Sequence, residues 1–194
     1  MLALKNLTFR YDNKVIFRRF SHSFPEQTLC FGLNGSGKST LIKLIAGLLT
    51  PENGSIWLDD RNDFHASILM DNRILFNEFT LSSHFDWILD EFSISYAAVK
   101  QQIQLFDIET WLDRKPAELS EGERQWAALA LVTVITADIY LLDEPIRSLD
   151  NDRILQLCDI IQHKIQAGNR FFLTAHQPEP FDSVLEPFEM NALL

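Results

Sequence analysis

The sequence of 194 residues is long enough for one large domain, or for one domain with a small subdomain. Its formal net charge of −10, with no basic cluster, makes it a poor binder of nucleic-acid phosphates, and we expect no nucleic-acid partner. No apolar run approaches the roughly 18 residues that a membrane span needs. The N-terminus turns polar within a few residues, so we expect no signal peptide.

Two cysteines, Cys30 and Cys158, both lie within apolar runs. Their positions do not exclude a disulfide, but two buried thiols in a reducing compartment are the expected state. Together with the acidic composition and the polar start of the chain, these thiols predict a cytoplasmic protein.

The first third of the chain is typical of strands. Apolar side chains alternate with polar ones over 7–11 and again over 20–24, and Asp12-Asn13 between them predicts a hairpin turn. A short apolar run over 28–31 predicts a buried strand that ends at Gly32. An apolar helix is expected over 41–49, stopped near Pro51, with a further strand over 55–58.

The middle of the chain has helical periodicity. Phe85, Ile88, Leu89 and Phe92 recur at i, i+3, i+4 and i+7, and we expect an α-helical subdomain, inserted at about 72–118, in a single domain of 1–194. Apolar runs over 139–142 and 171–174 then predict strands with a helix between them. The whole pattern predicts an α/β fold with a mainly parallel central sheet and an N-terminal antiparallel β subdomain.

A phosphate-binding loop is the clearest motif. Residues 32–39 read GLNGSGKS, which fits the P-loop pattern G-x-x-x-x-G-K-[ST] of a nucleoside triphosphatase. A predicted strand before it and a predicted helix after it argue against an ordinary glycine-rich turn. Glycines let backbone N–H groups approach phosphate oxygens, and the helix N-terminus favours an anion. The predicted nucleotide-binding residues are Asn34, Gly35, Ser36, Gly37, Lys38, Ser39 and Thr40, with Lys38 on the β- and γ-phosphates and Ser39 on Mg²⁺.

Two carboxylates follow the strand over 139–142. Asp143 at the end of that strand can hold Mg²⁺, and Glu144 can orient and deprotonate an attacking water molecule. Acidic residues also cap buried strands without any catalytic role. Only the P-loop upstream makes the catalytic interpretation the better one.

At 119–125 the chain reads LSEGERQ, between the P-loop and the acidic strand. This segment resembles the signature loop of the ATP-binding-cassette (ABC) family, specifically of the nucleotide-binding subunits of transporters, and the resemblance covers nearly the whole chain. It implies a head-to-tail homo- or heterodimer of cassettes, in which the signature residues Ser120, Gly122 and Glu123 face the γ-phosphate held by the opposite subunit. Ser120 and Glu123 also fit a helix capping box, and they can do both.

The resemblance assigns three more positions. His176 matches the switch histidine that contacts the γ-phosphate, which places it with Lys38 and Glu144 in the catalytic set. Asp150 belongs to the loop that crosses the dimer interface, and Tyr11 matches the aromatic residue that stacks on adenine. Without the resemblance, His176 fits a plain surface position and Tyr11 fits ordinary strand packing.

The chain departs from the family in two places. Asp71 stands where the family usually has a glutamine that binds the metal and water, and Asn72 is the alternative position. As a metal residue beside Ser39 and Asp143, an aspartate there would add negative charge to a site that already holds Asp143 and Glu144. Glu121 stands where the signature often has glycine, at the more tolerant of its two glycine positions.

We therefore expect an ATP-hydrolysing subunit, with Mg²⁺ bound to ATP, that powers a transporter. A polytopic membrane domain would hold it at the cytoplasmic face of a membrane and would dock on the aromatic-rich segment 71–92, although each aromatic residue by itself also fits packing within the subdomain. A soluble non-transport ABC ATPase and a weakly hydrolysing nucleotide-dependent regulator are the alternatives.

Overall fold

A computed structural model describes residues 1–70 and 74–190. Its central sheet has five strands in the order β5-β6-β7-β3-β8, and every neighbouring pair is parallel. The strands are β3 (Gln27–Phe31), β5 (Ala66–Leu69), β6 (Ile139–Asp143), β7 (Phe171–Ala175) and β8 (Glu186–Glu189). The predicted parallel α/β sheet is confirmed.

A second, antiparallel sheet contains β1 (Leu2–Tyr11), β2 (Lys14–Phe24) and β4 (Asn53–Leu58) in the order β2-β1-β4. Asp12 adopts a φ of 47° in the tight turn between β1 and β2, where a hairpin was expected. Both strands are longer than their alternating segments, because pairing with a neighbour extends them through residues that do not alternate. This sheet is the predicted N-terminal antiparallel β subdomain.

Five α-helices complete the described fold: α1 (Lys38–Ile45), α2 (Leu81–Phe92), α3 (Tyr96–Leu105), α4 (Glu121–Val134) and α5 (Asn151–Gln166). The expectation of a helix over 41–49 was wrong at both ends. The helix begins directly after Gly37, and the chain leaves it before Gly47, whose φ of 70° belongs to the left-handed region. Short 3₁₀ segments lie at Glu109–Trp111, Pro116–Glu118 and Phe181–Ser183.

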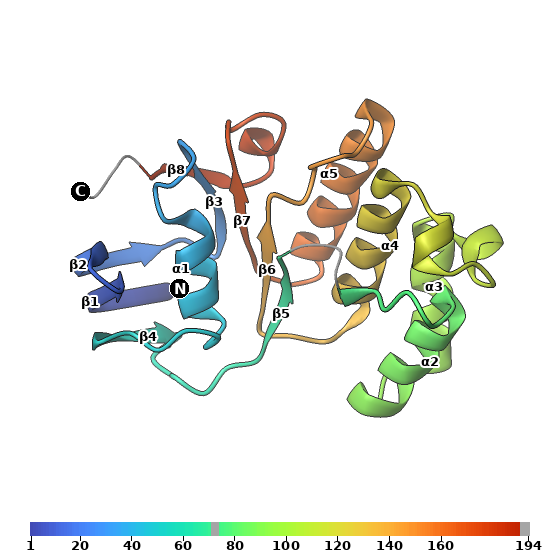
Figure 1. Ribbon diagram of the computed structural model, residues 1–194, viewed down its shortest axis with the longest axis horizontal. Coiled ribbons are helices and arrows are strands. Elements are labelled where there is room, and N and C mark those ends of the chain that lie inside the picture. The colour runs from blue at the N-terminus through green and yellow to red at the C-terminus, as the bar shows by residue number, and fades with distance from the viewer. Residues whose placement is uncertain (71–73, 191–194) are drawn as a thin grey trace.

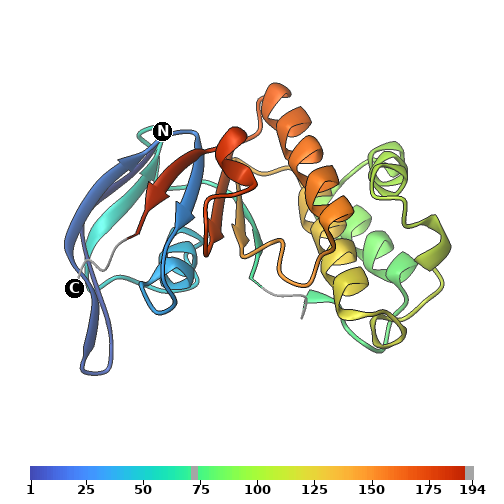
Figure 2. The same cartoon turned by 90° about the horizontal axis from the view of Figure 1, so that it is seen from above.

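Alternation along β6 explains the layers of the molecule. Ile139 and Leu141 point into a core shared with α1 and the antiparallel sheet, whereas Tyr140 and Leu142 point into a core shared with α4 and α5. Both faces of the parallel sheet are therefore covered, as its continuous apolar strands require. Figure 1 shows the antiparallel sheet at one end of the molecule and α2 and α3 at the other, and Figure 2 shows the layers edge-on.

Helices α2 and α3 pack against α4, on the side away from the sheet (Figure 2). The indole Nε1 of Trp126 donates to the carbonyl oxygen of Phe106 at 2.8 Å, and the buried amide of Gln102 donates to the hydroxyl of Thr133 at 2.6 Å. Buried polar groups here are thus hydrogen-bonded across helices, which fixes how α3 sits on α4. Within the described ranges, no helix is long and apolar enough to cross a membrane.

Candidate nucleotide-binding site

The P-loop connects β3 to α1 with the backbone that its glycines predict. Gly35 and Gly37 have φ values of 78° and 101°, a region that other residues seldom adopt. Gly37 is also the residue that caps α1, and its carbonyl oxygen accepts the N–H of Leu41 at 2.8 Å. A side chain at Gly37 would come within 3.0 Å of the Ile16 side chain, so the loop lies close against β2. The loop therefore presents backbone N–H groups and the N-terminus of α1 to an anion.

Lys38 lies inside this loop. Its side chain is buried, and Nζ donates to the carbonyl oxygens of Gly32 at 2.7 Å and Leu33 at 3.0 Å. An ammonium group has three donors, so these two contacts leave one for another acceptor. The lysine is thus held at the P-loop by the backbone that would surround a phosphate.

Two of the predicted catalytic residues, Glu144 and His176, lie close together at the carboxyl-terminal ends of the parallel strands. Nε2 of His176 lies 3.1 Å from Oε1 of Glu144. Glu144 follows β6 and His176 follows β7, and neighbouring parallel strands end at the same edge. A carboxylate this close to an imidazole can accept a proton from it or hold a water molecule beside it.

Thr174 is a site residue that sequence reasoning missed. Its hydroxyl donates to the Asp143 carboxylate, and the N–H of Glu144 donates back to the same hydroxyl oxygen at 3.1 Å. Glu144 itself has a φ of 49°, which is uncommon for a residue with a side chain. Thr174 lies opposite Asp143 in the β6–β7 register, so a strand alignment would have pointed to it. It fixes both acidic residues at the sheet edge.

Asp143, Glu144 and His176 line a cleft of about 910 Å³. From the predicted set, the cleft brings together Asn34 and Ser39 of the P-loop, Asp143, Glu144 and His176. The other lining residues are Met70, Glu121, Gln125, Ile146, Arg147, Ser148, Ala175, Gln177 and Glu179. Four lining side chains are carboxylates and one is an arginine, so the described wall is net negative. An ATP anion would enter it most favourably together with a cation.

The signature residues form the capping box that their spacing allowed. The hydroxyl of Ser120 accepts the N–H of Glu123 at 3.2 Å, and Oε2 of Glu123 accepts the N–H of Ser120 at 2.8 Å. The backbone N–H of Ser120, with Arg114 nearby, lowers the pKa of Glu123. Among the described residues, Asn34 and Ser39 line the cleft of this chain, whereas Ser120 and Gly122 do not.

Gly122 is confined by the loop that follows the acidic strand. A Cβ atom on Gly122 would lie 2.5 Å from the carbonyl oxygen of Ser148, a separation that only glycine tolerates. The same loop ends at Asp150, whose carboxylate caps α5 by accepting the N–H of Arg153 at 2.9 Å. Both Gly122 and Asp150 therefore have structural roles within one chain, alongside the interface roles expected of them.

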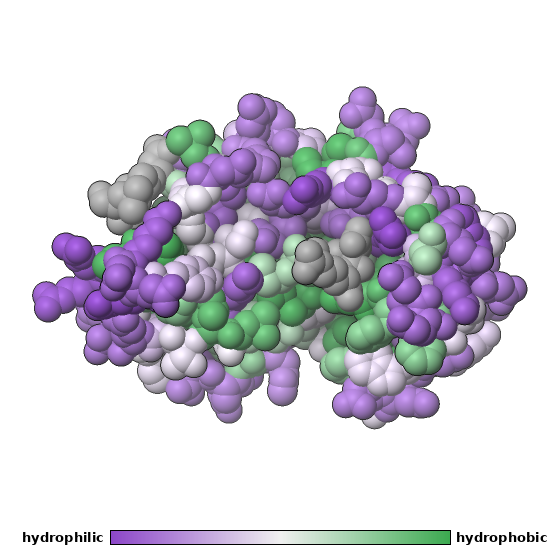
Figure 3. Space-filling model, viewed as in Figure 1, coloured by the Kyte–Doolittle hydropathy of each residue, from purple (hydrophilic) through white to green (hydrophobic). Residues whose placement is uncertain are grey.

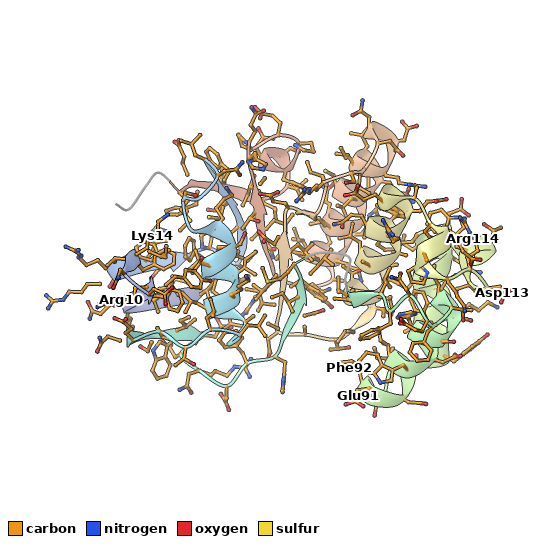
Figure 4. All side chains as sticks on the ribbon, in the orientation of Figure 1. Arg10, Lys14, Glu91, Phe92, Asp113 and Arg114 are labelled. Atoms are coloured by element: carbon orange, nitrogen blue, oxygen red, sulfur yellow. The ribbon has the colours of Figure 1, made fainter. Side chains whose placement is uncertain are left out.

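Tyr11 lies apart from the cleft, at the end of β1. Tyr11 is 42% exposed, and the centroid of its ring lies 4.9 Å from that of Phe9, with the two rings perpendicular. Its neighbours Arg10 and Lys14 extend from the tip of the hairpin (Figure 4). An exposed ring can stack on a base, and its adenine-binding role stays a prediction. Asp71 and its alternative Asn72 lie outside the described residues.

A metal ion would find few protein ligands here. Among the described residues, no group of three or more histidine, cysteine, aspartate or glutamate side chains could hold one. Ser39 and Asp143 both line the cleft, and a hydroxyl with a carboxylate is the pair that Mg²⁺ uses when phosphate oxygens supply further ligands. The residues present therefore fit a metal that arrives with its nucleotide.

Comparison with known proteins agrees with this geometry. Residues 19–147 match the family model described as ABC transporter. Over 180 residues the chain is 35% identical to the thiamine import ATP-binding protein ThiQ of Photorhabdus laumondii, covering 86% of this chain and 77% of that protein. It is 31% identical over 192 residues to the cytochrome c biogenesis ATP-binding export protein CcmA of Legionella pneumophila, covering 94% of this chain and 96% of that protein.

Solved structures show the same fold. An ATP-binding subunit of an ABC transporter superimposes with a TM-score of 0.86 at 22% identity, covering 97% of this chain and 85% of that one. CbiO1 of Clostridium perfringens, described as part of the ABC transporter complex CbiONQ, gives a TM-score of 0.81 at 20% identity, with 97% and 83% covered. The P-loop, the acidic strand and these relatives together establish that the chain belongs to the ABC transporter family, as one of its ATP-binding ATPase subunits.

Proposed function

We propose that this chain works as one half of a head-to-tail pair of cassettes, each of which binds Mg²⁺ with ATP and hydrolyses it. The observation that carries the proposal is the cleft that holds the P-loop residue Ser39 together with Asp143, Glu144 and His176. Among the described residues, these four side chains line one cleft of a single chain, and the signature residues Ser120 and Gly122 do not. The part still needed is a signature turn that would face the bound phosphates.

The second cassette would supply that turn. Ser120 and Gly122 stand at the N-terminus of α4, where unpaired N–H groups attract an anion, yet they do not line the cleft of their own chain within the described residues. In a head-to-tail pair, the turn of one chain would cover the phosphates bound to the other. Two such sites would form, and the loop ending at Asp150 would lie between them.

Within each site, we assign the residues as follows. Ser39 and Asp143 would hold the Mg²⁺ that neutralises phosphate charge, and Lys38 would turn its free donor toward the β- and γ-phosphates. The carboxylate of Glu144 would take a proton from the attacking water, while the imidazole of His176 keeps that carboxylate in place from 3.1 Å. Because the described wall of the cleft is net negative, we expect binding of ATP to depend strongly on Mg²⁺.

A membrane domain is the partner that we propose for the far end of the molecule. Phe76, Phe79 and Trp87, which are 54–56% exposed, surround a hollow of about 510 Å³ over α2, with His84 at its base. Figure 3 shows hydrophobic side chains reaching the surface beside α2, and Figure 4 shows Phe92 at its end. Exposed aromatic residues around a hollow suit a short helix of the partner.

We also propose that residues 1–194 form a single domain and that α2 and α3 belong to the helical subdomain inserted in it. The chain would be cytoplasmic, held at the membrane surface by its partner. A soluble non-transport ATPase or a weakly hydrolysing regulator remains the alternative, and no relative described above favours it.

The test is a pair of measurements on the purified chain and on cells that express it. Steady-state ATP hydrolysis should require Mg²⁺ and should be lost in Glu144→Gln, whereas a regulator would show little turnover before the substitution. Affinity purification from membranes should bring down a protein with several transmembrane helices, and Trp87→Ala should weaken that association. Exposed Lys100→Ala on α3 is the matched surface control. A chain that stays in the soluble fraction with full ATPase activity would contradict the transporter role.

A further inference from the structure

Three contacts join the first turns of α4 to the loop after the acidic strand, 145–150. Oγ of Ser148 donates to Oε1 of Glu121 at 2.9 Å. Gly122 lies so close to Ser148 that a Cβ atom would be 2.5 Å from its carbonyl oxygen. The buried amide of Gln125 donates to the carbonyl oxygen of Pro145 at 3.1 Å. We name this set of contacts the signature seam.

The signature seam holds a loop with unusual backbone conformations just before it and within it. Glu144 has a φ of 49° and Ser148 has a φ of 69°, and residues with side chains keep such conformations only where their surroundings impose them. The N–H of Arg147 closes a turn onto the carbonyl oxygen of Glu144 at 3.1 Å. A change at Ser148 therefore acts, through one short turn, on the residue that carries the catalytic carboxylate.

Glu121 is the part of the seam at which the chain departs from the signature motif that it resembles. The signature loop often has glycine at this position, and a glycine has no side chain with which to hold Ser148. Glu121 also lines the cleft, as Glu144 does. Its bond to Ser148 turns the negative charge toward the loop.

We propose that Glu121 is a positioning residue, which acts through Ser148 to tie the signature turn of a chain to the catalytic Glu144 of the same chain. The inference rests on the proposed head-to-tail pair. A signature turn that closes on the partner's ATP would then set the position of its own chain's Glu144. The hydrogen bond makes each hydrolysis site responsive to the nucleotide in the other.

A plain structural role for Glu121 gives different expectations. A carboxylate in the first turn of a helix stabilises the helix through its charge, with no need of Ser148. Glu121→Gln separates the two roles, because the amide oxygen still accepts the Ser148 hydroxyl while the charge is lost. If the charge alone matters, Glu121→Gln and Glu121→Ala behave alike.

The first experiment measures ATP turnover, the KM for Mg-ATP and the melting temperature of the full chain. We expect Glu121→Ala and Ser148→Ala each to lower kcat about fivefold, which is the loss of one hydrogen bond of about 1 kcal/mol. The double variant should be no slower than either single one, and Glu121→Gln should keep wild-type turnover. KM should stay within about twofold, because the P-loop is untouched. Glu109→Ala, at an exposed position of the segment Glu109–Trp111, controls for loss of a surface carboxylate.

The second experiment uses mixed pairs purified through two different tags. In the first pair, Glu121→Ala is placed on the chain that keeps Glu144, and its partner carries Glu144→Gln. In the second pair, Glu121→Ala and Glu144→Gln are on the same chain, opposite a wild-type partner. The proposal predicts slow turnover only in the first pair, whereas a Glu121 that contacts the partner's phosphate would slow only the second.

Wild-type turnover in Glu121→Ala, additive effects in the double variant, or slowing of the second pair would each overturn the proposal. The proposed function fails in a separate way. There, Glu144→Gln would retain activity or no pair would form with Mg-ATP, whatever residue stands at 121.

Discussion

The capping box of α4 provides a perturbation whose size can be worked out from the structure. Ser120→Ala removes the hydroxyl that accepts the N–H of Glu123 at 3.2 Å and leaves that donor without a partner. The return bond survives, because it uses the backbone N–H of Ser120 and Oε2 of Glu123 at 2.8 Å. Half of the box is therefore lost.

Loss of a serine N-cap costs about 1 kcal/mol of unfolding free energy. For a domain of this size, that free energy corresponds to a fall in Tm of roughly 2–4 °C. Ser120→Asn should melt within about 1 °C of the wild type, because asparagine caps as well as serine. Differential scanning calorimetry at neutral pH, with nucleotide absent, measures the difference directly.

The same two variants separate stability from catalysis. If the Ser120 hydroxyl also contacts the partner's phosphate, Ser120→Asn should restore the melting temperature and still hydrolyse ATP slowly. An unchanged Tm in Ser120→Ala would refute the capping argument. Full turnover in Ser120→Asn would refute the phosphate contact and leave the cap intact.

Three further outcomes follow from single contacts. Gly122→Ala should lower stability by about 1–3 kcal/mol, since its Cβ would meet a backbone oxygen at 2.5 Å, and a wild-type melting curve would contradict that packing. Hydrogen bonds from the N–H of His65 and from Arg61 lower the pKa of Asp138 below 3.8, so Asp138→Asn should be less stable than the wild type at neutral pH. Urea unfolding midpoints should show that this difference in stability vanishes as the pH falls through the pKa of Asp138 in the folded chain. Burial raises the pKa of Cys30 to about 12 and of Cys158 to about 11, so a thiol reagent at pH 8 should label the folded chain slowly and the unfolded chain fully.

Much of the fold was predictable, because its main signals are local. Alternation over 7–11 and the apolar run over 139–142 reflect which faces of a strand are buried, and both lie within strands. The P-loop glycines are required by positive φ angles that any sequence in that loop must satisfy. Of the two cysteines expected to be buried thiols, Cys30 is a buried free thiol, whereas Cys158 is a free thiol that is only partly buried.

The rest depended on contacts between distant segments. The true start of α1 at Lys38 is set by Gly37, which caps the helix in a left-handed conformation that periodicity does not detect. The role of Thr174 arises only when β7 lies beside β6 in a particular register. The sequence marked Glu121 only as a departure from the signature motif and predicted no contact for it. Its hydrogen bond with Ser148 is visible only in three dimensions.

The most direct test of the account is the mass in solution of the Glu144→Gln variant with and without Mg-ATP. Each chain has a mass of 22.4 kDa, and light scattering after size exclusion should show a shift to about twice that mass when Mg-ATP is present. Adding Lys38→Ala or Ser120→Asn should abolish the shift, since one weakens the P-loop and the other the opposing turn. A Glu144→Gln chain that binds Mg-ATP and remains monomeric would contradict the account.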